Sequence, residues 1–460
     1  MLFERIESEG LAHFSYLIGD QREAVVIDPR RDCDVYIDKA TQAGYRITTV
    51  LETHRNEDYV IGSVELASRL EQEGNTVQIW HAESMLDYQY GLPAQDGQTW
   101  QIGRLSLTAL HTPGHTPGHM SYLLTDPDQN PWVVFTGDAL FAGDVGRMDL
   151  LGEEALTDMA EMLYDSLFNK LLPLGDEVIV CPAHGAGSVC GSGIAERVWT
   201  TIGLERKHSA KLQHLQKDDF LARVPRMLER PPYFRRMEQL NLAGAPVLKS
   251  LPVPPQLRPS RFWELARTED YRVLDTRMEL AFGAAHVPQA LSIWQAGLAS
   301  FAGWFLPYDK PLLLVTPEDD PRATVRTLVR LGYDNIAGTL AGGMLQWHMA
   351  GLNSQHIRTV TTHELCAQLD TGLAAWILDV RSDEEVAAEG EIPDAHHIHI
   401  TQIPEHMDEV PQDQLIYIFC GSGLRSMVVA SYLQRQGWDA LTVVLGGVKG
   451  WDSTSCPLEL

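Results

Sequence analysis

The sequence predicts an α/β protein with three domains: an α/β/β/α sandwich over residues 1–240, and two smaller parallel α/β domains over residues 260–352 and 358–460. Three observations support this prediction. The 460-residue chain is too long for one hydrophobic core, because single cores stop growing at roughly 250–300 residues. In the first half, polar motifs recur after short apolar strands. In the second half, a long segment occurs twice.

Short β-type runs and helical stretches alternate in the first half. Residues 13–18 and 23–28 have hairpin-like spacing, and a helical stretch near 34–43 leads to an apolar strand at 47–51. Four motifs that contain His or Asp each follow such a strand, at residues 54–59, 111–115, 136–138 and 181–184. Loops at strand ends commonly carry chemistry. We therefore expect these motifs to meet along one edge of the sandwich.

His54, His115 and Asp138 in these motifs predict a metal site. Two imidazoles and one carboxylate form the facial triad that holds non-heme Fe(II) and leaves coordination positions open for oxygen chemistry. We expect one Fe(2+) per chain. Zinc accepts the same ligands, but it would restrict the site to Lewis-acid hydrolysis. His184 is expected beside the metal, where it would orient ligands or substrate.

The first motif resembles a degenerate form of the H-x-H-x-D-H pattern of the metallo-β-lactamase superfamily. His54 and Asp58 match that pattern, whereas Asn56 and Tyr59 stand where it has histidines. Neither replacement is a usual ligand of a catalytic divalent metal. A two-metal hydrolase is therefore disfavoured, and ligands for one metal remain.

Residues 141–150, with the sequence FAGDVGRMDL, follow Asp138 and resemble the signature of persulfide dioxygenases within that superfamily. The resemblance covers about residues 1–240. It implies iron bound by the three residues named above, with Arg147 and Asp149 in structural or substrate-side positions near the metal. Cys190 follows His184 by six residues and is a candidate for the mouth of the pocket, although a packing cysteine is equally compatible. The candidates around the metal are His184, Asp58, Tyr59, Arg147 and Cys190.

The second half contains a repeat at an offset of 104 residues. Residues 273–277 (VLDTR) match 377–381 (ILDVR), and Trp347 matches Trp451. Apolar strands in both copies are followed by helix-like segments, which indicates parallel α/β units. A proline-rich stretch at 245–259 separates the repeat from the first half and is expected to be a semi-rigid linker.

The second copy contains the sequence CGSGLR between an apolar strand and a helix start. Glycine-rich N–H groups and a helix N-terminus favour an anion there, so the loop should stabilise a thiolate or a persulfide. This loop resembles that of the rhodanese family, in which Asp379 and Arg381 would have structural roles. We expect Cys420 and Arg425 to be catalytic, and the persulfide loop to comprise Gly421, Ser422, Gly423 and Leu424.

The matching loop of the first copy begins at Thr316 and carries Glu318, Asp319 and Asp320. A hydroxyl cannot carry sulfane sulfur, and the three carboxylates would repel a persulfide anion. The first copy is therefore expected to be an inactive scaffold.

Together these features resemble bacterial fusions of a persulfide dioxygenase with sulfurtransferase domains, over nearly the whole chain. The resemblance implies oxidation of low-molecular-weight thiol persulfides by O2 to sulfite, and combination of sulfite with sulfane sulfur to give thiosulfate, as in sulfide detoxification. Two alternatives stay open: a glyoxalase-II-like zinc thioester hydrolase with an accessory rhodanese domain, and a sulfur carrier without oxygenase activity. The sequence does not identify the thiol of the persulfide.

Composition limits the kinds of partner that the protein is expected to bind. The formal net charge of −26 argues against nucleic-acid binding, which needs a basic surface. No apolar run reaches the roughly 18 residues of a membrane span, and acidic residues within Met1–Glu7 argue against a signal peptide. Six cysteines without C-x-x-C spacing suggest free thiols in a cytoplasmic protein. Association into a homo-oligomer stays open.

Overall fold

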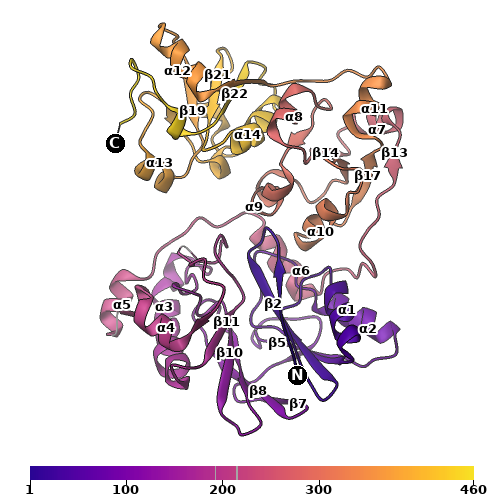
Figure 1. Ribbon diagram of the computed structural model, residues 1–460, viewed down its shortest axis with the longest axis vertical. Coiled ribbons are helices and arrows are strands. Elements are labelled where there is room, and N and C mark those ends of the chain that lie inside the picture. Colours follow the sequence, from indigo (N-terminus) through magenta and orange to yellow (C-terminus); the bar gives the residue numbers. More distant parts are fainter. Residues whose placement is uncertain (192, 214–215, 460) are drawn as a thin grey trace. The chain divides into compact units, whose positions relative to one another are not determined.

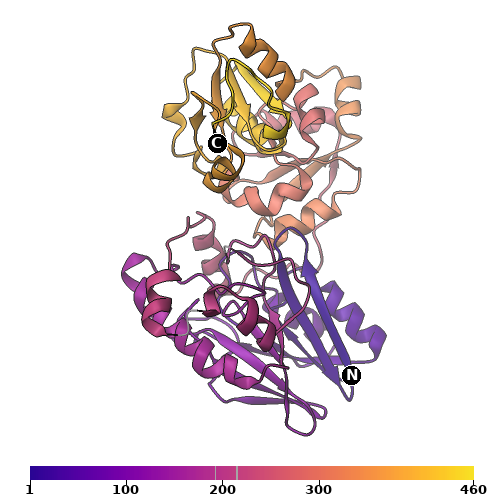
Figure 2. The same ribbon diagram turned by 60° about the vertical axis from the view of Figure 1, so that its left-hand side comes forward.

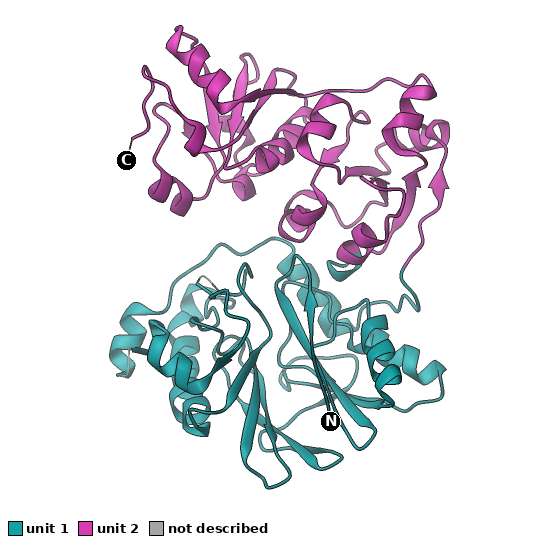
Figure 3. Ribbon diagram, in the orientation of Figure 1, with its two compact units in different colours: residues 1–251, 329–332 teal, residues 252–328, 333–460 magenta. Residues whose placement is uncertain are grey.

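The computed structural model describes residues 1–191, 193–213 and 216–459. The chain forms two compact units: unit 1 comprises residues 1–251 and 329–332, and unit 2 comprises residues 252–328 and 333–460 (Figure 3). Among the described residues, no helix is both long and apolar enough to cross a membrane.

Unit 1 contains two six-stranded sheets. The first has the order β1-β2-β3-β4-β5-β6, and the second has the order β12-β11-β10-β9-β8-β7. The strands of the first sheet are β1 (Leu2–Ser8), β2 (His13–Asp20), β3 (Glu23–Ile27), β4 (Arg46–Leu51), β5 (Gln78–His81) and β6 (Leu92–Pro93). Those of the second are β7 (Thr99–Ile102), β8 (Leu105–His111), β9 (Met120–Thr125), β10 (Pro131–Gly137), β11 (Ile179–Pro182) and β12 (Thr200–Thr201).

Helices cover the outer faces of both sheets (Figures 1 and 2). The helices of unit 1 are α1 (Asp34–Ala43), α2 (Ser63–Gln72), α3 (Leu156–Ser166), α4 (Ile202–His208), α5 (Lys217–Arg223) and α6 (Phe234–Ala243). Tyr36 of α1 and Leu66 of α2 share a buried core with residues of the first sheet, while Leu163 of α3 shares another with Val180 of the second. The layers therefore follow the order α/β/β/α, as the sequence predicts.

The alternation of side chains along β3 shows why these residues form a strand of a sandwich. Val25 and Ile27 enter the core between the two sheets, whereas Ala24 and Val26 enter the core beneath α1 and α2. Because successive side chains of a strand point to opposite faces, an uninterrupted apolar strand can be buried on both sides.

Unit 2 contains two five-stranded sheets with the same strand order. The first is β13-β17-β16-β14-β15 and the second is β18-β22-β21-β19-β20, with parallel pairing throughout. The strands are β13 (Gln256–Leu257), β14 (Arg272–Asp275), β15 (Leu291–Ser292), β16 (Leu312–Val315), β17 (Ile336–Leu340), β18 (Arg358–Thr361), β19 (Trp376–Asp379), β20 (His396–His397), β21 (Ile416–Phe419) and β22 (Leu441–Leu445). This shared order confirms that the sequence repeat is a repeat of structure.

The helices of unit 2 connect these strands (Figure 1). They are α7 (Pro259–Ala266), α8 (Glu279–Ala284), α9 (Leu298–Phe305), α10 (Arg322–Arg330), α11 (Gly343–Met349), α12 (Thr362–Asp370), α13 (Asp383–Glu389) and α14 (Leu424–Arg435). The proline-rich stretch contributes more than a linker, because β13 lies within it and pairs with β17. That strand needs only two residues, which a pattern search does not separate from the surrounding prolines.

Candidate active sites

Four buried side chains with metal-ligand chemistry meet at one edge of unit 1: His54, Glu57, His115 and Asp138. We call them the four-donor cluster. His54 and Glu57 follow β4 of the first sheet, whereas His115 lies between β8 and β9 and Asp138 follows β10, all in the second sheet. The cluster is therefore built from both sheets. The structure brings together the three residues that the sequence proposes as metal ligands.

Hydrogen bonds fix the two imidazoles so that their Nε2 atoms face the cluster. The Thr53 hydroxyl donates to Asp28 at 2.8 Å, so its oxygen is left to accept the Nδ1–H of His54 at 2.9 Å. The Nδ1–H of His115 donates to the carbonyl oxygen of Arg147 at 2.9 Å. With Nδ1 engaged in this way, Nε2 is the nitrogen of each ring that can bind a metal, which is the usual arrangement of a metal-binding histidine.

The spacing of the donor atoms fits a cation. Asp138 Oδ2 lies 3.7 Å from His54 Nε2 and 3.5 Å from His115 Nε2. Both Nε2 atoms are buried and make no hydrogen bond within the described part of the chain. Buried polar atoms without a partner are costly and rare. Two imidazoles and a carboxylate that converge in this way are suited to Fe(II).

Glu57 was not singled out from the sequence, yet it belongs to the cluster. Its Oε1 lies 3.0 Å from His115 Nε2, and the side chain is fully buried. Although burial raises the pKa of the Glu57 carboxyl, the charge of His115 outweighs burial and lowers that pKa to about 2. The only sequence signal was a second acid beside Asp58 in a loop that had lost two histidines.

Asp138 is also held by His184, from the loop after β11. His184 Nδ1 lies 2.7 Å from Asp138 Oδ1. Burial alone would raise the pKa of the Asp138 carboxyl, but the imidazoles of His184 and His54 hold it well below its usual range. His184 thus lies beside the predicted ligands, at the place that the sequence suggests for a residue that orients them.

Arg147 links His115 to a neighbouring loop. Besides accepting from His115 through its carbonyl oxygen, it forms two side-chain hydrogen bonds of 2.8 Å to Asp149. Its backbone N–H donates to the carbonyl oxygen of Cys190 at 3.2 Å. The Asp149 carboxylate also accepts from the N–H of Leu228 at 2.7 Å. These contacts indicate that Arg147 and Asp149 position the ligand loop.

The remaining candidates lie outside the four-donor cluster. Tyr59 is fully buried and packs on His13, with ring centroids 4.1 Å apart. Asp58 and Cys190 instead join His184 in a second group of buried donors, which we call the thiol cluster. The H-x-H-x-D-H spacing does not predict that Asp58 and Cys190 lie in this second group. The loop turns between Glu57 and Asp58, so that the Glu57 carboxylate lies in the four-donor cluster and the Asp58 carboxylate in the thiol cluster.

In unit 2, Cys420 lies between β21 and α14. Its side chain is buried, and its sulfur accepts a hydrogen bond of 3.1 Å from the backbone N–H of Gly423. Gly423 has a φ of 109° and directly precedes α14, so the loop needs a residue without a Cβ there. This arrangement brings the thiol to the backbone N–H of Gly423 and to a helix N-terminus, which favours an anionic sulfur.

Arg425 forms an ion pair with a residue that the sequence did not reveal. Its two terminal nitrogens each lie 2.6 Å from a carboxylate oxygen of Glu385 in α13. The hydrogen bonds from Arg425 lower the pKa of the Glu385 carboxyl to about 2. Glu385 also accepts a hydrogen bond from the N–H of Ser382 in a capping box. This second bond orients the carboxylate toward Arg425.

Comparison with known proteins agrees with the division of the chain into an N-terminal sandwich and two repeated domains. A model described as metallo-beta-lactamase superfamily matches residues 9–184, and one described as rhodanese-like domain matches residues 258–350 and 361–454. Persulfide dioxygenase ETHE1 of Bos taurus is 31% identical over 194 residues, which are 40% of this chain and 68% of that protein. Putative sulfurtransferase YtwF of Bacillus subtilis is 39% identical over 101 residues, which are 22% of this chain and 96% of that protein.

The chain is a fusion of a metallo-beta-lactamase superfamily domain with two rhodanese-like domains. Its N-terminal part is also similar to a hydrolase. Hydroxyacylglutathione hydrolase GloC of Haemophilus influenzae is 28% identical over 214 residues, which are 42% of this chain and 89% of that protein. A crystal structure of a metallo-beta-lactamase from Staphylococcus aureus subsp. aureus COL aligns with a TM-score of 0.65 and 29% identity, and covers 74% of this chain and 99% of that one.

The first rhodanese-like domain has no thiol in the loop after β16. Thr316 stands there, and its hydroxyl donates to the carbonyl oxygen of Glu318 at 2.6 Å. Asp320 pairs with Arg322 at the start of α10, and the acidic residues of the loop are exposed. The loop therefore offers a persulfide neither a nucleophile nor a positive surrounding.

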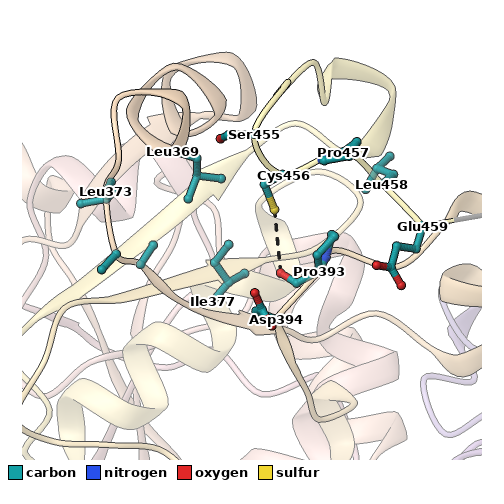
Figure 4. A pocket seen from close by; sticks show the side chains of 12 residues that line it. Leu369, Leu373, Ile377, Pro393, Asp394, Ser455, Cys456, Pro457, Leu458 and Glu459 are labelled. Atoms are coloured by element: carbon teal, nitrogen blue, oxygen red, sulfur yellow. Dashed lines mark hydrogen bonds between the residues drawn. The ribbon is translucent and has the colours of Figure 1, made fainter.

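The second rhodanese-like domain also contains a cavity of about 470 Å³ that does not involve the Cys420 loop (Figure 4). Leu369 and Ile377 form part of its wall, and the C-terminal segment with Cys456 closes another side. The Cys456 thiol donates to the carbonyl oxygen of Pro393 at 3.8 Å. The lining is mixed apolar and polar, and no charged group pairs with the thiol among the described residues.

Proposed function

We propose that the chain is an iron-dependent persulfide dioxygenase and sulfurtransferase. It would convert a thiol persulfide, O2 and water into the thiol, sulfite and two protons, and then combine sulfite with a sulfane sulfur to give thiosulfate. The single observation that supports this proposal is the presence, in one chain, of a buried His54/His115/Asp138 donor set and a Cys420 thiol on a rhodanese-like loop.

In the first domain, Fe(II) held by the three donors would supply the chemistry of oxygen activation. The chain itself fixes the reacting geometry. Thr53 and the Arg147 carbonyl oxygen hold the two imidazoles, and His184 holds Asp138. Because all three donors are fully buried, bulk water is kept away from them.

In the second domain, the Cys420 sulfur would attack the outer sulfur of a persulfide and release the thiol. Cys420 would then carry that sulfur as a persulfide, which the N–H groups of the loop stabilise as an anion. Sulfite would attack the outer sulfur, break the S–S bond, form thiosulfate and regenerate the Cys420 thiolate. A cytoplasmic location suits this cycle, since all six cysteines are free thiols.

Metal analysis tests the proposed iron-dependent oxygenase activity of the first domain. Purified under reducing conditions, the protein should contain about one iron per chain, and His54→Ala should lose both iron and oxygen uptake. The matched control is His111→Ala, because His111 ends β8, directly before the loop that carries His115, and its Nε2 contacts the Pro117 carbonyl oxygen at 3.0 Å instead of the cluster. Both variants should keep sulfurtransferase activity. Persulfide-independent hydrolysis of a glutathione thioester by a zinc protein without oxygen uptake would favour the hydrolase alternative.

Product analysis tests the coupling of the two halves. With persulfide and O2, the wild type should give mainly thiosulfate, and Cys420→Ser should give mainly sulfite at a similar initial rate of oxygen uptake. Cys456→Ser, a thiol change in the same domain, should behave as the wild type. Equal ratios of sulfite to thiosulfate in wild type and Cys420→Ser would refute the coupling.

A further inference from the structure

Unit 2 contains a cavity of about 150 Å³ that the proposed chemistry does not use. Residues of both rhodanese-like domains line it. The first domain contributes residues around the end of α7 and the start of β14, together with Pro288 and Gln289, and the second contributes Arg435 at the end of α14 (Figure 1). A ligand in this cavity would therefore contact both domains.

Three guanidinium groups line the cavity, which we call the arginine pocket: those of Arg267, Arg272 and Arg435. The one carboxylate among the described lining residues is that of Glu269. Its side chain is 89% exposed, and it lies 3.4 Å from Arg272 and 4.0 Å from Lys310. One exposed carboxylate shared between two cations leaves the pocket with a surplus of positive charge, in a chain whose formal net charge is −26.

Two of the three guanidinium groups lack a partner. The side chains of Arg267 and Arg435 form no hydrogen bond or ion pair within the described part of the chain. Arg435 is half-buried, and burial together with the neighbouring charge of Arg272 lowers the pKa of its guanidinium. Both causes act against the charged form. An anion between Arg272 and Arg435 would offset their repulsion and give the N–H groups acceptors.

The backbone that carries Arg435 is held against the first domain. Ser431 Oγ accepts a hydrogen bond of 2.9 Å from the N–H of Ser292, and Gln434 Oε1 lies 2.9 Å from Nε2 of His286. Both contacts join the last two turns of α14 to the inactive copy. Because these contacts fix the two domains locally, the arginine pocket is preorganised for a ligand, which lowers the cost of binding.

We propose that the arginine pocket binds a small divalent oxyanion with the shape of sulfate, and that the bound anion joins the two rhodanese-like domains. Guanidinium groups present N–H donors in a planar fork that matches the oxygens of such an anion. The cavity volume of about 150 Å³ lies below the roughly 300–1,000 Å³ of sites for larger organic ligands. Thiosulfate, the product of the proposed cycle, belongs to this class of anion, but the inference does not rest on that cycle.

The arginine pocket is separate from the Cys420 loop. Cys420 precedes α14, and Arg435 is the last residue of this 12-residue helix, so the two ends lie about 18 Å apart. An anion in the pocket would therefore leave the thiol accessible, and substitution of Arg435 would not alter the loop itself.

Isothermal titration calorimetry tests this site in the full chain carrying Cys420→Ser, which prevents sulfur transfer from the probe. Sulfate, thiosulfate and phosphate are titrated separately at constant ionic strength, and each should bind saturably. The additional change Arg435→Gln should weaken binding at least about tenfold, because a charge-assisted hydrogen bond is lost. The matched control is Arg261→Gln, since Arg261 lies in α7 but pairs with Glu264 at 2.8 Å outside the pocket. This control should bind the anions as its parent does.

Absence of saturable binding in the parent, or an affinity that Arg435→Gln leaves unchanged, would overturn the proposal. Tighter binding of thiosulfate than of sulfate and phosphate would support a site for thiosulfate, and similar affinities would support a general oxyanion site.

Arginine modification by phenylglyoxal gives a second test, which needs no variant. In the wild type, sulfate should slow the modification of Arg267 and Arg435 several-fold and leave that of Arg261 unchanged, as measured by mass spectrometry of the peptides. Equal rates with and without sulfate at all three residues would refute the site. Neither test measures oxygen uptake or sulfur transfer, so failure of this site is distinguishable from failure of the proposed function.

Discussion

The two rhodanese-like domains share a strand order and differ in one loop. Each contains an Asp-x-Arg clamp at the end of its second strand, Asp275 with Arg277 and Asp379 with Arg381, and in both clamps three side-chain hydrogen bonds of similar length join the guanidinium to the carboxylate. After β16, however, the chain has an exposed acidic loop, whereas after β21 it has a buried thiol that accepts a backbone N–H. The sheet and the clamp are thus common to both copies, and the chemistry proposed for the second copy depends on a few loop residues.

The largest expected difference comes from removing the thiol. Cys420→Ser should reduce sulfurtransferase activity by at least about 1000-fold, because a hydroxyl is a poor nucleophile and cannot carry sulfane sulfur. A thiosulfate-to-cyanide transfer assay measures this loss. Residual activity near the wild-type level would place the reactive thiol elsewhere in the chain.

The clamps should differ in their contribution to stability. Arg381 is fully buried, and Asp379→Asn leaves it only the Glu389 carboxylate at 3.4 Å, so this change should lower the free energy of unfolding by up to about 3–5 kcal/mol. The matched change Asp275→Asn should cost less, since the side chain of Arg277 is 14% exposed and water can reach it. Urea unfolding of both variants checks this order, and a larger loss in Asp275→Asn would contradict it.

The Glu385–Arg425 pair has no equivalent in the first copy, where Ala281 stands at the 104-residue offset from Glu385. Because Arg425 lowers the pKa of Glu385 from 4.5 to about 2, the pair stabilises the folded state above pH 4.5, and this contribution is lost as pH falls toward 2. Glu385→Gln should therefore cost up to about 1 kcal/mol at pH 7, since the pair is partly exposed. The difference from wild type in urea unfolding should shrink at pH 4, and a difference that grows there would contradict the prediction.

The smallest change is expected when the first copy receives a thiol. Thr316→Cys in a Cys420→Ser background should gain no measurable sulfur transfer, because Glu318, Asp319 and Asp320 still disfavour an anion. Mass spectrometry of the peptide with residue 316 measures its persulfide. A persulfide on that residue would show that the thiol alone is sufficient.

The sequence predicts the fold class well, because the relevant signals are local or periodic. Apolar strands such as Leu312–Val315 and the 104-residue repeat need no tertiary information, and the shared strand order confirms the repeat. The comparisons confirm the two kinds of domain. The domain boundaries at residues 240, 260, 352 and 358 remain predictions, as do the catalytic and metal-binding roles of the site residues.

The side chains that the sequence did not reveal are those placed by tertiary packing. Glu57 and Asp58 are adjacent, yet they join different clusters because of the path of one loop. Glu385 meets Arg425 only because α13 lies beside the start of α14, forty residues along the chain. Cys190 reaches His184 through the irregular segment after β11. No periodic pattern encodes any of these contacts.

The origin of the four-donor cluster in both sheets has a consequence for biogenesis. His54 and Glu57 arrive with the first sheet, and His115 and Asp138 arrive with the second, so no half of the sandwich holds a complete metal site. In a chain that has not yet folded, the donor atoms would be too far apart to bind one cation together. A metal held by the four-donor cluster would therefore be acquired late in maturation, after the two sheets have closed on each other, and it would then hold them together.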